Sequence, residues 1–254
     1  MKTKTTLFRI RTIYLFLAIA FVPIPAQAQE NEAELILKTM SEYIGSQESI
    51  ELTFNSDIEI ITPQLEKIQF TNSGTALLSR PNNLYAHRIS AHADVKLFYD
   101  GKTVSIYEKK VNGYVQFDAP GSIDQFVEEM REGEGVALPG ADLLLTSSFD
   151  VLIADTMEAK YIGRGVIDGR ECEHLAFRNF DTDWQLWVQA GDKPIPCKMV
   201  ITSKTMNSAP QYTLHIKSWN EVAAPEQDFF DFTPPAGAKE LNHEALIGFD
   251  ELPP

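Results

Sequence analysis

Apolar and polar residues alternate with a period of two along most of the chain, which is the pattern of strands with one buried face. The clearest run has Ile50, Leu52 and Phe54 between polar neighbours. Similar runs recur at 68–78, 84–91, 95–99, 104–107 and 114–117, and again at 159–167, 171–178, 184–188, 195–202 and 212–219. A short strand is expected at 228–232, and the acidic, proline-terminated residues after Lys239 are expected to be loose. The pattern predicts about ten strands.

Turn signals between these runs predict how the strands are joined. Asp100 and Gly101 separate two short runs, and the Asn112-Gly113 and Asp168-Gly169 pairs do the same further along. Such pairs favour tight hairpins because both central residues need positive φ. Pro81 belongs at a strand end, since it cannot donate a ladder hydrogen bond. Hairpins join antiparallel neighbours, so we predict a single antiparallel sheet.

Three segments break the alternation with helical spacing. Residues 30–47 carry an apolar stripe typical of an amphipathic helix that ends at Gly45. Residues 122–132 and 140–154 are short, very apolar helical segments inside a region of about 121–155, and a capping-box pattern opens at Ser122. They are interpreted either as a cover over an open sheet or as ordinary core helices. The fold class is mostly β with α (α+β).

The first 28 residues have the features of a secretory signal peptide. A cationic start is followed by an apolar run at 13–24 and by Ala26-Gln27-Ala28, a small-residue cleavage site. The apolar run is shorter than the roughly 20 residues of a membrane-spanning helix. We therefore expect cleavage after Ala28, no stable membrane insertion afterwards, a periplasmic location, and one domain over residues 29–254.

The net charge and the two cysteines bear on which partners the protein binds and on whether it contains a disulfide. The net charge of −14 argues against binding to nucleic acid or to anionic lipid surfaces. Cys172 and Cys197 fall on the first and third strands of a predicted meander. Alternate strands stand about 9–10 Å apart, beyond the Cα separation of about 7 Å that a disulfide allows. The two are therefore expected to be separate, buried thiols, although a different register would restore a bridge.

No familiar catalytic, metal or cofactor motif is found. The five histidines are scattered, and neither cysteine has a Cys-x-x-Cys partner, so no metal site is predicted. There is no Gly-x-Ser-x-Gly elbow and no glycine-rich phosphate loop. We expect no catalytic residues, no cofactor and no enzymatic activity. The many aromatic residues on strands instead favour an apolar cavity, with a filled core as the alternative.

Three stretches resemble the lipoprotein-localisation (LolA/LolB-like) superfamily of periplasmic lipoprotein carriers. They are residues 74–85, which contain Arg80-Pro81, residues 99–107 and residues 230–237. The stretches 174–178, 183–187, 191–194 and 210–212 look like a related group of uncharacterised predicted periplasmic proteins. The resemblance implies an incomplete β-barrel around helices, with an apolar cavity for acyl chains and with Arg80 hydrogen-bonded to a helical lid. Leu77 departs from the carriers, which commonly have tryptophan there.

Two functional hypotheses follow. The first is a non-enzymatic, monomeric periplasmic carrier or binder of a hydrophobic ligand, either a lipid or a lipid-modified protein. Its predicted ligand-binding residues are Arg80, Leu78, Phe54, Phe70, Tyr85, Tyr99, Phe126, Leu144, Phe149 and Trp184. The alternative is an envelope interaction module with a filled core, which would bind a protein partner through a sheet edge or its acidic surface.

Overall fold

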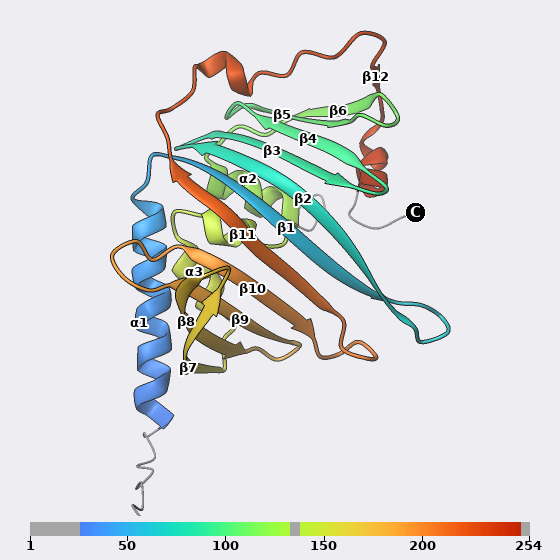
Figure 1. Ribbon diagram of the computed structural model, residues 1–254. Helices are drawn as coiled ribbons and strands as arrows, with labels where there is room; N and C mark the ends of the chain where they lie inside the picture. The colour runs from blue at the N-terminus through green and yellow to red at the C-terminus, as the bar shows by residue number, and fades with distance from the viewer. Residues whose placement is uncertain (1–25, 133–137, 250–254) are drawn as a thin grey trace, which may run out of the picture.

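A computed structural model describes residues 26–132 and 138–249, which form one curved sheet with helices packed against its concave side (Figure 1). Within these residues the sheet has twelve strands in the order β12-β6-β5-β4-β3-β2-β1-β11-β10-β9-β8-β7. Its end strands, β12 and β7, do not pair with each other, so the sheet is an open half-barrel. The predicted mostly β, incomplete-barrel fold is confirmed. Residues 1–25 of the predicted signal peptide lie outside the described ranges, and the division at residue 28 stays a prediction.

The strands follow the predicted runs closely. Their bounds are β1 (Ser49–Ile61), β2 (Lys67–Ser79), β3 (Asn83–Ser90), β4 (Asp94–Tyr99), β5 (Thr103–Glu108), β6 (Gly113–Asp118), β7 (Glu158–Ile167), β8 (Arg170–Arg178), β9 (Thr182–Gln189), β10 (Pro196–Ser203), β11 (Gln211–Glu221) and β12 (Lys239–Glu240). All pairs are antiparallel except β12 with β6, which is parallel.

Antiparallel hairpins form at all three predicted sites, but only the Asp168-Gly169 pair has positive φ at both residues. Asp168 and Gly169 both have positive φ, 49° and 79°, as the two-residue turn between β7 and β8 requires. In the β4–β5 turn, Gly101 has φ 86°. The Asp100 carboxylate there accepts hydrogen bonds from the backbone N–H groups of Lys102 and Thr103 at 2.8 and 2.7 Å. These local contacts stabilise the turn that joins β4 to β5.

The helical elements are α1 (Ala26–Gly45), α2 (Ile123–Glu132), η1 (Ala141–Leu144), α3 (Ser148–Ile153), η2 (Gln227–Phe230) and η3 (His243–Phe249). α1 begins before the predicted start at residue 30, and it packs along β7 and against α3 (Figure 1). The predicted stripe of α1 is fully buried at Ala33, Leu37, Met40 and Ile44. No helix in the described parts of the chain is long and apolar enough to span a bilayer.

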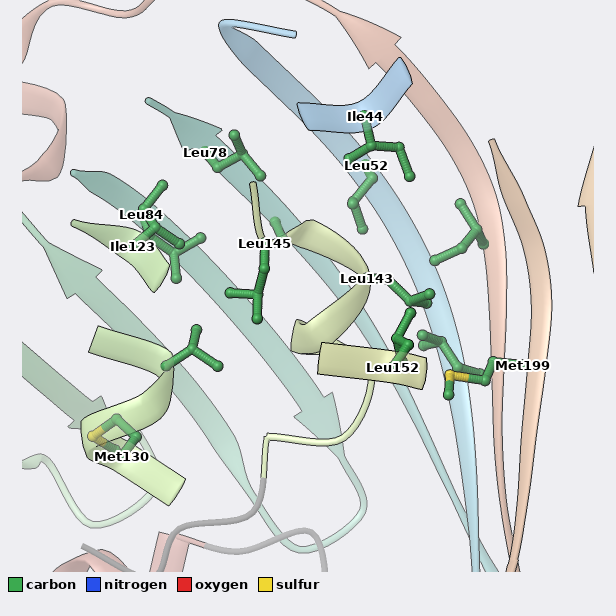
Figure 2. Packing of buried hydrophobic residues seen from close by; sticks show 14 of the residues in the cluster. Ile44, Leu52, Leu78, Leu84, Ile123, Met130, Leu143, Leu145, Leu152 and Met199 are labelled. Atoms are coloured by element: carbon green, nitrogen blue, oxygen red, sulfur yellow. The ribbon is translucent and has the colours of Figure 1, made fainter. Parts of the chain in front are cut away.

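One hydrophobic core joins the sheet to the elements on its concave side. In Figure 2, Leu143 and Leu152 extend from η1 and α3 toward Met199 of β10, and Leu145 belongs to the same buried cluster. Leu143 and Leu145 are 2 % and 3 % exposed. Burying such leucine side chains contributes about 1.5–3 kcal/mol each. The leucine-rich segments therefore pack inside the half-barrel.

The C-terminal segment differs from its prediction. Residues 228–232 were expected to form a strand, but residues 227–230 form η2, and two prolines after Phe232 prevent a ladder from continuing. Residues after Lys239 were expected to be loose. They instead add β12 to β6 and then form η3, where Leu246 is 7 % exposed. The loose-tail prediction was wrong because Leu241 packs on Gly113 and Leu246 reaches the core.

The predicted separation of the two cysteines is also wrong. Both are fully buried free thiols, as expected, but their Sγ atoms lie only 2.8 Å apart. Cys172 pairs with Gln189, the last residue of β9, and Cys197 lies at an irregularity between Pro196 and Lys198 in β10. The estimate from the spacing of alternate strands assumed a regular register, and the irregularity at Cys197 departs from it.

Candidate ligand cavity

A cavity of about 560 Å³ lies between the concave face of the sheet and the elements α2 and η1. Its walls come from β1 to β5, β11, α2, η1 and η3, and include Leu52, Phe54, Leu97, Met130, Leu144 and Leu246. Most of the lining side chains are aliphatic or aromatic. Ligand pockets of proteins have about 300–1,000 Å³ and mainly apolar walls, so the size and lining fit a small hydrophobic ligand.

Part of the cavity wall is the ring of Phe54 lying across Gly74. Phe54 of β1 is paired with Gly74 of β2. A Cβ atom at position 74 would collide with the Phe54 ring and with the carbonyl oxygen of His87. The glycine therefore allows the ring to lie close to the sheet.

Arg80 joins the sheet to the cover of the cavity, meaning α2, η1 and α3. Its Nη2 donates to the carbonyl oxygen of Leu144 at 2.7 Å, and its Nη1 donates to Oγ1 of Thr146 at 3.0 Å. Nε and Nη2 also donate to the carbonyls of Gln47 and Ile44, at the end of α1, at 3.1 and 3.4 Å. One guanidinium thus joins β2, α1 and the cover.

The electrostatics around Arg80 are balanced by one carboxylate. Burial lowers the pKa of Arg80, and the neighbouring Asp124 carboxylate acts in the opposite direction. Asp124 also accepts a hydrogen bond from the backbone N–H of Thr146, at 3.1 Å to each oxygen. α2 is therefore tied to the segment that follows η1. Its start has the predicted capping box, in which Ser122 N–H donates to Gln125 and Gln125 N–H donates to Ser122.

A buried serine pair anchors α3 to α1. The hydroxyl groups of Ser41 and Ser148 lie 2.6 Å apart, and the backbone N–H of Phe149 donates to Oγ of Ser41 at 2.7 Å. Ser148 is fully buried. These bonds satisfy polar groups at the start of α3 that would otherwise be costly to bury. α1 is therefore the support on which one part of the cover rests.

Only two of the ten predicted ligand-binding residues, Phe54 and Leu144, line the cavity. Arg80 holds the cover, as described. Leu78 and Trp184 are buried in the core, Phe149 packs against the core, and Tyr99 stacks on Phe126 of α2. Tyr85 instead contacts Phe98 and Phe229, and Phe70 contacts His92. Whether any of the ten binds a ligand stays a prediction.

The sequence interpretation missed Arg88, His243, Glu244 and Leu246, which also line the cavity. For Arg88 a signal existed in the alternation of β3. Leu84, Ala86 and Arg88 are two apart, so they share the inner face, and the third is charged. For η3 no signal was visible, because its placement depends on contacts with β6, distant in the sequence.

The cavity mainly offers burial of apolar surface. Among the described residues, no group of three or more His, Cys, Asp or Glu side chains could hold a metal ion. Tyr212 and Trp219 line the cavity, but their polar hydrogens are directed to Pro139 and Gln47. The fold and the cavity define a class, namely open half-barrels with an apolar cavity beneath a helical cover.

The chain belongs to the family described as "Predicted periplasmic protein (DUF2092)", whose model matches residues 33–242. The predicted periplasmic location is thereby confirmed. The chain is also 24 % identical, over 221 residues, to an uncharacterized protein of Methanocaldococcus jannaschii. That match covers 84 % of this chain and 55 % of the relative, so the chain spans about half the length of that protein.

Solved structures with a related fold include LprF from Mycobacterium bovis, with 13 % identity, a TM-score of 0.47, and coverage of 78 % of this chain and 98 % of that one. A LolA superfamily protein from Nitrosomonas europaea has 14 % identity and a TM-score of 0.35, covering 78 % and 97 %. MucB, which has also been solved in complex with MucA from Pseudomonas aeruginosa, has 14 % identity and a TM-score of 0.44, covering 80 % and 63 %. TM-scores below 0.5 say nothing about function.

Proposed function

We propose that this protein is a non-enzymatic periplasmic carrier or binder of a hydrophobic ligand, either a free lipid or the acyl group of a lipid-modified protein. The observation that supports the proposal is the apolar cavity of about 560 Å³ beneath a cover fastened by Arg80. Burial of apolar ligand surface supplies about 25 cal/mol per Å², so a single acyl chain gains enough to bind without specific polar contacts.

The alternative, an interaction module, was predicted with a filled interior. The described residues instead surround a cavity with apolar walls. A cavity of this kind is costly to maintain, because its lining side chains lose packing contacts. Occupation by a ligand would restore those contacts, and this favours the carrier proposal.

Filling the cavity from one wall tests the proposal. Ala86 lies on the inner face of β3, and Ile89 lies on the opposite face of the same strand, 47 % exposed. Ala86→Phe is expected to reduce the affinity for the probe N-phenyl-1-naphthylamine about tenfold or more, because the new ring occupies ligand space. Ile89→Phe adds a ring of the same size outside the cavity and should bind like the wild type.

Fluorescence titration measures both affinities, and thermal unfolding checks that both variants are folded. Equal binding by wild type and Ala86→Phe would place the probe elsewhere and contradict the proposal. Extraction of the purified protein with organic solvent, followed by mass spectrometry, would then identify any lipid that it carries from the cell.

A further inference from the structure

The charged side chains of the cavity are not distributed evenly along it. Among the described residues that line it, the charged or titratable ones are Arg88, Tyr212, His243 and Glu244. His243 and Glu244 both belong to η3 and are exposed. Arg88 differs from them because it lies on the inner face of β3, within the sheet, and its Nη1 atom is buried.

The position of Arg88 gives the cavity two different ends. Leu84, Ala86 and Arg88 follow one another along the inner face of β3, and four residues of strand span about 13 Å. Leu84 lies at the end near Arg80 and the cover, and it is 9 % exposed. Val95 of β4, the pairing partner of Arg88, also lines the cavity. The cation therefore stands at one end of an otherwise apolar wall.

We propose that Arg88 binds the anionic head of an amphiphile, a carboxylate or a phosphate, whose acyl chain extends along β3 toward Leu84. This inference rests on the proposed function. A guanidinium has five donors in a planar fork that matches a carboxylate or phosphate with two parallel hydrogen bonds. The proposal requires only that some of these donors serve the ligand.

Because the whole protein is negatively charged, an anionic ligand must be attracted by a local positive charge, here that of Arg88. The chain has a net charge of −14, which repels anionic ligands at long range. Within the cavity, Glu244 is a further negative group, but its side chain is exposed and its field is screened by water. A partly buried guanidinium is screened less, so it governs the choice of head group.

A pair of probes that differ only in the head group tests the inference. cis-Parinaric acid and the corresponding alcohol have the same chain, and only the acid is anionic. The wild type is expected to bind the acid about tenfold more tightly than the alcohol, the usual effect of one charge-assisted hydrogen-bond pair. In Arg88→Met, which has a similar stem without the charge, this preference should disappear while the alcohol still binds.

Two further variants separate position from charge. Arg88→Lys retains the charge at the same place and should retain part of the preference for the acid. Lys96→Met removes one positive charge from the other face of β4 and should leave the preference intact, since Val95 and Leu97 are the cavity-lining neighbours. A parallel titration with a single-chain phosphate monoester shows whether a phosphate or a carboxylate binds more tightly.

The outcomes distinguish this inference from the proposed function. If the wild type binds both probes equally, or if Arg88→Met keeps the preference for the acid, the role of Arg88 is refuted while hydrophobic binding stands. If the wild type binds neither probe, both the role of Arg88 and the proposed function fail.

Discussion

At the scale of single residues, Cys172 and Cys197 are both fully buried, and their Sγ atoms lie 2.8 Å apart. Cys172 pairs with Gln189 of β9, and Cys197 lies at the irregularity in β10 between the residues that pair with Val188 and Trp187. No alternation pattern shows where such an irregularity falls, and the distance estimate assumed a regular register.

The reduced thiols should make stability sensitive to alkaline pH. Burial, with a further contribution from Cys172, raises the pKa of Cys197 from 9.0 to about 12. The unfolded chain releases this proton near pH 9 and the folded chain does not, so the stabilisation is complete below pH 9. It is lost as the pH rises from 9 toward about 12. Urea unfolding of the reduced protein at several pH values measures this loss.

The matching experiment uses the oxidised protein. Two thiols in contact in an exported chain are expected to form a disulfide when a protein disulfide oxidant accepts their two electrons and two protons are released. The disulfide has no thiol proton, so the oxidised form should lack this part of the pH dependence. Identical pH profiles for reduced and oxidised protein would show that Cys197 does not titrate as described.

At the scale of elements, the strands and the cover were predictable to different degrees. The hairpins at Asp100 and Asp168 could be predicted because the residues that favour a turn lie within a few positions of one another. The cover segments were recognised as helical from their spacing, but whether they enclosed a cavity was left open. That question depends on the distance between α2 and the sheet, which periodicity does not encode. Arg80 was assigned to the cover only through a family resemblance.

Removing Arg80 should loosen the cover. Arg80→Leu eliminates the hydrogen bonds to Leu144, Thr146 and the end of α1, and leaves carbonyl groups unsatisfied. Loss of such partly buried, charge-assisted bonds is expected to cost about 2 kcal/mol in the free energy of unfolding. A bound hydrophobic probe should also dissociate faster, because η1 is no longer held to β2. Urea unfolding and stopped-flow fluorescence measure the two effects.

Arg164→Leu is the matched control for this change. Arg164 of β7 has a 62 % exposed side chain and pairs with Glu173, and neither residue lines the cavity. Its replacement should leave the free energy of unfolding and the probe dissociation rate close to the wild-type values. If Arg80→Leu behaves like Arg164→Leu in both measurements, Arg80 does not fasten the cover.

At the scale of the whole molecule, the C-terminal segment links the outer surface to the cavity. After β11 it crosses the strands β3 to β6 (Figure 1), where Phe229 contacts Tyr85 and Phe232 contacts Phe98. It then adds β12 to β6, and η3 places Leu246 in the cavity wall. The sequence of this segment contains two adjacent prolines and many acids, so local pattern alone predicted a loose tail. Its order comes from contacts with strands more than 100 residues earlier.

Leu246 is the residue through which this segment should influence the ligand. The Leu246 side chain is 7 % exposed and forms part of the cavity wall. Leu246→Ala should therefore open a gap in this wall. We expect a bound hydrophobic probe to dissociate several-fold faster, with a loss of about 2 kcal/mol in the free energy of unfolding for the deleted buried atoms.

Leu35→Ala, at a 64 % exposed position of α1, is the control for a leucine outside the core. Stopped-flow release of the probe compares them. Equal release rates for wild type, Leu35→Ala and Leu246→Ala would mean that η3 does not form a functional wall, and the ligand would then have to leave through the cover that Arg80 fastens.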